Sequence, residues 1–120
     1  MRVVIFSGTT EGRALSAELA GLGAQVTAWV ATEYGRALQA APGVELHAGR
    51  LDAQGMAQAL AGADLCIDAT HPYAREASRN IRQGAEIAGV PRLRLLRRES
   101  FPREIHRSSF SAVFRMGLSR

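Results

Sequence analysis

Short apolar segments alternate with helical patterns along the first 97 residues, and this alternation limits the chain to one fold class. The predicted strands span residues 3–6, 25–31, 44–48, 65–68 and 92–95. The predicted helices between them span residues 11–22, 34–39, 53–60 and 74–88. Alternation of this kind is typical of a parallel sheet with helices on both faces. We therefore expect an α/β fold, a Rossmann-like doubly wound parallel sheet of about five strands.

The expected order of the strands is 3-2-1-4-5, because right-handed crossovers favour it in doubly wound sheets. In that order the first and fourth strands are neighbours, so the loops after Phe6 and Asp68 face one crevice. Ligands bind in this crevice in open α/β sheets. Asp52 is predicted to cap the third helix, and glycines 23, 43, 62 and 89 are predicted to end helices.

Composition indicates a single globular domain. The chain has 120 residues, of which 47% are hydrophobic, and no apolar run approaches the ~20 residues that span a bilayer. The first residues do not resemble a signal peptide, so we expect a cytoplasmic protein without membrane contact. The single cysteine, Cys66, lies in an apolar strand and is expected to be buried. We predict no metal site.

All 15 cationic residues are arginines, and the net charge is +4. Abundant Ala, Gly and Arg are typical of a GC-rich genome, which explains the composition without any function. Arginine is also the better bidentate partner for carboxylate and phosphate. The charge therefore favours anionic ligands over cationic ones.

The loop after the first strand is a candidate phosphate site. Its glycines are four residues apart, unlike the G-x-G-x-x-G fingerprint of dinucleotide-binding folds. Gly8 allows close approach of a ligand, a threonine can cap the helix, and the helix N-terminus attracts anions. The alternative is an ordinary turn with a threonine cap. The candidate cofactor-binding residues here are Ser7, Gly8, Thr9, Thr10, Glu11, Gly12 and Arg13.

The end of the second strand bears on the choice of cofactor. An acidic residue there holds the free ribose of NAD, whereas Arg and hydroxyl groups accommodate the 2′-phosphate of NADP. Thr32 and Arg36 suit the phosphate, while Glu33 suits the free ribose. Thr32 and Arg36 are therefore candidate cofactor-binding residues for NADPH, with NADH as the alternative.

The loop after the fourth strand carries Thr70, His71, Pro72 and Tyr73. Pro72 fits the first turn of a helix, with Thr70 or His71 at the cap. Thr70 is also a candidate cofactor-binding residue. His71 and Tyr73 are candidate catalytic residues, because both can donate a proton or orient a substrate beside a cofactor. Substrate contact or packing is the alternative role for both side chains.

Arg75, Arg79 and Arg82 share one face of the following helix. Such a stripe is either solvated or a basic wall for a substrate with several carboxylates, which makes these residues candidate substrate-binding groups. Nucleic acid is not an expected partner, because the chain has no aromatic stacking platform and no known binding motif.

Four segments together resemble the precorrin-6A reductase family of cobalamin biosynthesis. They are Ser-Gly-Thr-Thr-Glu-Gly-Arg at 7–13, Asp-Ala-Thr-His-Pro-Tyr-Ala at 68–74, Arg79-Asn80, and Arg-Leu-Arg-Leu-Leu-Arg at 92–97. The resemblance implies an NAD(P)H-dependent oxidoreductase that transfers a hydride to a corrin precursor, a tetrapyrrole. It also implies a cleft between two α/β lobes, with the loops at 8–13 and 70–73 on one wall.

The resemblance covers residues 1–97, and residues 98–120 are expected to form an unassigned tail in place of the family's second domain. A truncation or a frameshift would give such a chain. We therefore expect nucleotide binding without reductase turnover, in a monomer or weak homo-oligomer. Two alternatives stay open: a non-catalytic nucleotide-binding module that works with a partner chain, and an Arg-rich nucleic-acid-binding domain.

Overall fold

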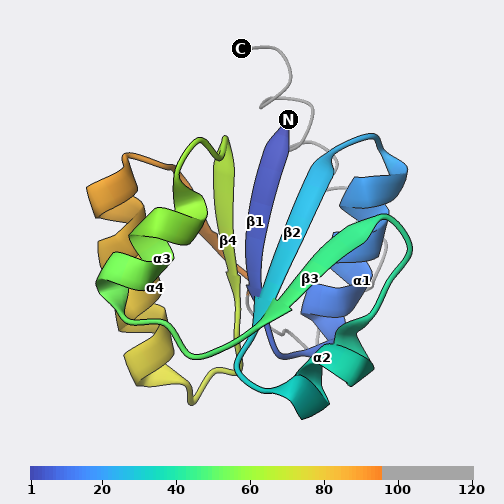
Figure 1. The fold of residues 1–120 in the computed structure, drawn as a ribbon, viewed down its shortest axis with the longest axis horizontal. Coiled ribbons are helices and arrows are strands. Elements are labelled where there is room, and N and C mark those ends of the chain that lie inside the picture. Colours follow the sequence, from blue (N-terminus) through green and yellow to red (C-terminus); the bar gives the residue numbers. More distant parts are fainter. Residues whose placement is uncertain (96–120) are drawn as a thin grey trace.

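The computed structural model describes residues 1–95, and they form a five-stranded parallel sheet. The strand order is β3-β2-β1-β4-β5, which confirms the predicted doubly wound topology (Figure 1). The strands are β1 (Arg2–Ser7), β2 (Gln25–Val30), β3 (Val44–Ala48), β4 (Leu65–Ala69) and β5 (Arg92–Arg94). The predicted tail at 98–120 lies outside the described residues.

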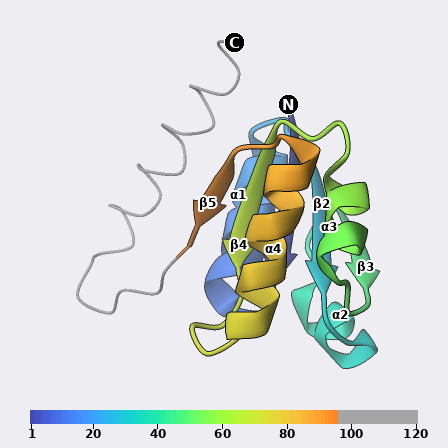
Figure 2. The same cartoon turned by 90° about the vertical axis from the view of Figure 1, so that its left-hand side faces the viewer.

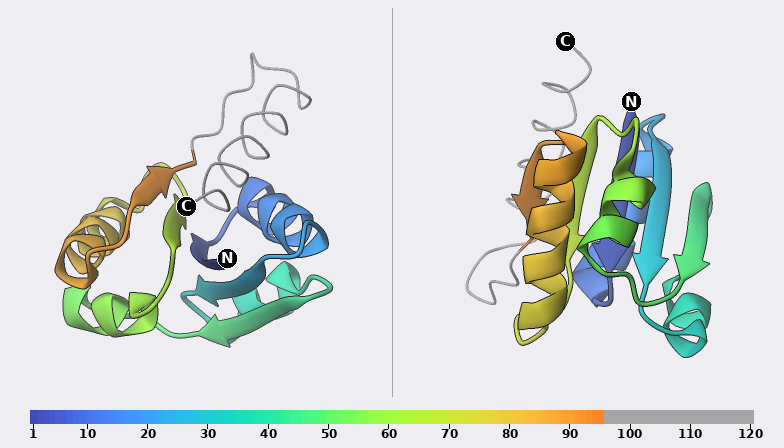
Figure 3. Two further views of the ribbon diagram at one scale, coloured as in Figure 1. Left: turned by 90° about the horizontal axis from the view of Figure 1, so that it is seen from above. Right: turned by 60° about the vertical axis from the view of Figure 1, so that its left-hand side comes forward.

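Within residues 1–95, four helices cover the two faces of the sheet. Figures 1 and 3 show α1 and α2 on one face and α3 and α4 on the other. Their bounds, each within one residue of the predicted ones, are α1 (Thr10–Gly21), α2 (Glu33–Gln39), α3 (Ala53–Leu60) and α4 (Arg75–Ala88). Figure 2 shows β5 at the edge of the sheet, beside β4.

The sheet separates two hydrophobic cores, because neighbouring residues of a strand point to opposite faces. On one face Val3 and Ile5 pack with α1, and on the other Val4 and Phe6 pack with α3 and α4. Cys66 belongs to the second core and is fully buried, as expected. Burial, and secondly the nearby charge of Asp68, raise the pKa of the Cys66 thiol to about 12.

The predicted N-cap of α3 and most of the predicted glycine stops have their expected chemistry. The backbone N–H of Gly55 donates to Asp52 Oδ1 at 2.8 Å, which confirms Asp52 as the N-cap of α3. Gly23, Gly62 and Gly89 have positive φ at or next to the C-caps of α1, α3 and α4, whereas Gly43, also with positive φ, lies three residues past the C-cap of α2. Among residues 1–95, no helix has the length and apolar character needed to cross a bilayer.

Helices α3 and α4 pack closely at Gly84. A Cβ at this position would lie 2.8 Å from the Met56 Cβ and 3.0 Å from both the Ala53 O and Ala57 N atoms. Two of these contacts are backbone atoms, so the helices would have to move apart to admit a methyl group.

We predict that Gly84→Ala lowers the free energy of unfolding by about 1–2 kcal/mol, because overpacking outweighs the gain in helix propensity. Urea unfolding followed by circular dichroism measures the change. Gly21→Ala is the matched control, since a Cβ at Gly21 meets no atom within 4 Å. Stability equal to that of the Gly21→Ala variant would show that α3 and α4 are not in close contact.

Candidate functional site

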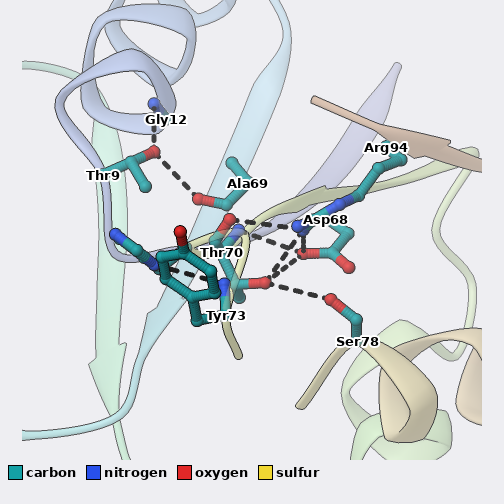
Figure 4. A network of polar contacts seen from close by, with 9 residues as sticks. Thr9, Gly12, Asp68, Ala69, Thr70, Tyr73, Ser78 and Arg94 are labelled. Atoms are coloured by element: carbon teal, nitrogen blue, oxygen red, sulfur yellow. Dashed lines mark hydrogen bonds and ion pairs between the residues drawn. The ribbon is translucent and has the colours of Figure 1, made fainter. Parts of the chain in front are cut away.

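The loops after β1 and β4 are joined by one threonine side chain. Thr9 Oγ1 accepts a hydrogen bond from the Gly12 N–H at 3.1 Å, which makes Thr9 the N-cap of α1. The same hydroxyl donates to the Ala69 carbonyl at the end of β4, at 2.9 Å (Figure 4). The contact confirms that the two loops meet at the carboxyl ends of β1 and β4, as the strand order predicts.

The two glycines of the first loop have different surroundings. A Cβ at Gly12 would lie 2.5 Å from Ser7 Oγ and 2.8 Å from the Ala69 Cβ, so α1 can approach the sheet only with glycine there. A Cβ at Gly8 would meet no atom within 4 Å. Gly12 is therefore needed for packing, whereas Gly8 leaves space open beside the N-terminus of α1.

Gln39 forms hydrogen bonds to the residues on both sides of Gly8. Ser7 Oγ donates to Gln39 Oε1 at 2.7 Å, and Gln39 Nε2 donates to the Thr9 carbonyl at 3.2 Å. Gln39 is buried at the end of α2, with a relative exposure of 9%. Sequence analysis missed this residue, and no local pattern marks it, because its partners are about thirty residues away in the chain.

The residues after β2 interact mainly with one another. Thr32 caps α2, where its hydroxyl accepts from the Gly35 N–H at 3.0 Å. Arg36 lies 3.5 Å from Glu33 in an exposed ion pair. In the first loop, Arg13 Nε donates to the Ala40 carbonyl at 3.1 Å.

A buried carboxylate lies at the end of β4. Asp68 is fully buried, and its Oδ1 atom accepts from Arg94 at 2.6 Å, the Thr70 hydroxyl at 2.6 Å and the Thr70 N–H at 3.0 Å. The other oxygen, Oδ2, has no hydrogen-bond partner in the part of the chain that the structure describes. Burial of a carboxylate is favourable only with such pairing, so this ion pair with β5 is what allows Asp68 to be there.

The same network fixes Thr70. Arg94 donates to the Thr70 hydroxyl at 3.0 Å and to the Thr70 carbonyl at 3.3 Å, and Ser78 Oγ of α4 lies 3.3 Å from that hydroxyl (Figure 4). Sequence analysis did not identify Asp68 or Ser78 as site residues and noted Arg94 only within the segment at 92–97 that resembles the family. The available signal was an acidic residue ending an apolar strand, beside an arginine on the next strand.

His71 and Tyr73 lie side by side on the turn before α4. The Tyr73 N–H donates to His71 Nδ1 at 3.2 Å, and the centroids of the two rings are 5.2 Å apart. Tyr73 is 82% exposed. The predicted cap was wrong: α4 begins at Arg75 with Ala74 at the N-cap and no side-chain cap, so Pro72 precedes the helix. Thr70 cannot serve as the cap because its side chain is held by Asp68 and Arg94.

A cavity of about 510 Å³ opens at the carboxyl ends of the strands, on the face covered by α3 and α4. Of the predicted site residues, those that line it are Ser7, Gly8, Thr70, His71, Tyr73 and Arg75. Those outside its lining are Thr9, Thr10, Glu11, Gly12, Arg13, Thr32, Arg36, Arg79 and Arg82. Trp29 and Arg50, which sequence analysis did not single out, also line it. No group of three or more His, Cys, Asp or Glu within residues 1–95 is arranged to hold a metal ion.

We predict that Arg94→Met lowers the free energy of unfolding by about 3 kcal/mol, because it leaves the Asp68 carboxylate buried without its charged partner. Urea unfolding at neutral pH measures the loss. The double variant Asp68→Asn/Arg94→Met should recover part of it, since no unpaired charge stays buried. Arg92→Met, an exposed neighbour on β5, is the control and should change stability by less than about 0.5 kcal/mol. Equal stability of the Arg92→Met and Arg94→Met variants would contradict the prediction.

A family model and the curated relatives of this chain name the same kind of reductase. The family model described as "Precorrin-6x reductase CbiJ/CobK" matches residues 2–114, which extends past the boundary expected at residue 97. The cobalt-precorrin-6A reductase of Methanothermobacter thermautotrophicus is 34% identical over 106 residues, which is 85% of this chain and 35% of that protein. The Salmonella typhimurium enzyme of the same name is 33% identical over 112 residues, which is 92% of this chain and 43% of that protein.

Solved structures show the same similarity. A structure described as CobK precorrin-6A reductase superposes with a TM-score of 0.70 and 26% identity, over 85% of this chain and 40% of that one. A putative epimerase from Bacteroides thetaiotaomicron, with a TM-score of 0.63 and 21% identity over 87% of this chain and 57% of that one, shares the fold. The chain spans less than half the length of the two cobalt-precorrin-6A reductases described above. Because the family model matches nearly all of its residues, the chain belongs to the CbiJ/CobK precorrin-6x reductase family.

Proposed function

We propose that this chain forms the nicotinamide-cofactor lobe of a reductase that acts on a precorrin-6A-type tetrapyrrole in cobalamin biosynthesis, with NADPH as the hydride donor. The observation that carries the proposal is the cavity at the carboxyl ends of β1 to β4, with the open space at Gly8 on its wall. This is the place where dinucleotides bind in doubly wound sheets. Family membership supplies the reaction class.

The residues at the first loop fit a diphosphate. Gly8 has no side chain to exclude it, and the first amide groups of α1 have no acceptors within the helix. Gln39 bonds to Ser7 and to the Thr9 carbonyl, so the loop is held in one conformation before a ligand arrives. A preorganised loop loses little entropy on binding. When bound, the cofactor supplies a hydride from its nicotinamide ring.

The residues after β4 fit the reacting end of the site. His71 and Tyr73 are exposed at the cavity, where a side chain can give a proton to a substrate or orient it. Arg75 also lines the cavity, and Arg79 and Arg82 are exposed further along α4. We assign these three arginines to the carboxylates of the tetrapyrrole, because guanidinium groups bind carboxylates with two parallel hydrogen bonds.

Trp29 provides a direct test, because it is the single tryptophan of the chain and it lines the cavity. We expect NADPH to quench its fluorescence in a saturable titration. N-acetyltryptophanamide, titrated in parallel, corrects for light absorbed by the nucleotide. A fluorescence that follows this reference at every NADPH concentration would overturn the proposed site.

We predict that Gly8→Val weakens NADPH binding at least about tenfold, because the added side chain occupies the space meant for the cofactor. The fold should tolerate it, since Gly8 has no positive φ and its Cβ position is open. The control is Ala14→Val, an exposed change on α1 outside the cavity lining. Unchanged affinity in the Gly8→Val variant would place the cofactor elsewhere.

A further inference from the structure

Three arginines lie near the ends of β1, β2 and β3, where the adenosine half of a dinucleotide rests in this topology. Arg13 donates to the Ala40 carbonyl, and Arg36 pairs with Glu33. Neither of them lines the cavity. Arg50, in the loop after β3, does line it and is exposed.

Arg50 has no hydrogen bond or ion pair to any residue that the structure describes. An arginine without an internal carboxylate binds an anionic ligand without first giving up an ion pair. Arg50 meets this condition and lines the cavity, whereas Arg36 lies outside the lining. The charged group available to a ligand at this end of the cavity is therefore the guanidinium of Arg50.

The acidic side chain of the cavity lining lies away from Arg50. Within the described lining the sole acidic residue is Glu76, which belongs to α4 at the opposite end. Glu33, the candidate for a free ribose, lies outside the lining and is paired with Arg36. A site selective for the free ribose of NAD requires an acidic acceptor at the adenosine end, and a site for the 2′-phosphate requires a cation.

We propose that Arg50 binds the 2′-phosphate of NADPH and is the residue that selects NADPH over NADH. The loop that carries it is anchored from both sides. Gly49 N–H donates to the Val30 carbonyl at 2.8 Å, and Asp52 caps α3 two residues later. The Arg50 backbone thus has a fixed position beside the cavity, next to the end of β2. The inference rests on the proposed function, because it assumes that the cofactor occupies this cavity.

The test compares NADPH with NADH, which differ in the 2′-phosphate alone. Both are titrated against the 120-residue chain with Trp29 fluorescence as the signal. In the unaltered chain we expect NADPH to bind more tightly than NADH. In the Arg50→Ala variant we expect NADPH to bind about 10- to 100-fold more weakly, the usual effect of losing a charged hydrogen bond, with NADH affinity unchanged.

Two variants sharpen the comparison. Arg36→Ala removes a nearby arginine outside the lining and should leave the NADPH affinity unchanged. Arg50→Lys keeps the charge without the planar fork and should show an intermediate affinity. Urea unfolding of each variant confirms that the fold is retained, as expected for substitutions of exposed side chains.

Four other results would overturn the inference. Equal weakening of NADPH and NADH by Arg50→Ala would mean that Arg50 contacts a part common to both, and would overturn the inference. So would a loss confined to Arg36→Ala, or equal affinities of the unaltered chain for both nucleotides. If NADPH and NADH both fail to bind the unaltered chain, the proposed function falls and this inference with it.

Discussion

The parallel pairing of β1 with β4 is the contact on which the candidate site depends. The strands β2 and β3 lie on one side of β1, and β4 and β5 lie on the other. Two segments about sixty residues apart in the sequence thus become neighbours. The pairing ends with Ser7 opposite Ala69, so the loops that follow must leave the sheet side by side. Thr9 then bridges them through the Ala69 carbonyl. Without this pairing, Gly8 and His71 would not line the same cavity.

The second loop depends on a buried charge rather than on a helix cap. Thr70 would be a good N-cap residue by type, but its hydroxyl donates to Asp68 and accepts from Arg94. The turn from 71 to 74 is consequently free of the helix, and His71 and Tyr73 are presented at the cavity. The arrangement relies on β5, which supplies Arg94 although it has only three residues. A short edge strand thus controls the geometry of a loop on its neighbour.

Prediction from the sequence succeeded where the signal is local. The strands and helices follow from hydrophobic periodicity, and a threonine cap for α1, the Asp52 cap and the glycine stops at 23, 62 and 89 follow from the chemistry of helix ends. It failed for residues whose roles come from distant partners. Gln39 and Arg94 are ordinary helix and strand residues in the sequence, and the α4 cap was wrong because a tertiary hydrogen bond outweighed a local preference.

The sequence by itself determined the fold class, the strand order and the family, because alternating periodicity, handed crossovers and two loop motifs are all properties of local segments. The tertiary structure alone decided which polar side chains face the cavity. Thr32 and Arg36, predicted cofactor residues by position, lie outside the cavity lining, whereas Arg50 lies on the cavity wall without a partner among residues 1–95. Whether an arginine can reach a ligand depends on its proximity to the cavity. That proximity is set by the packing of strands and helices far apart in the chain.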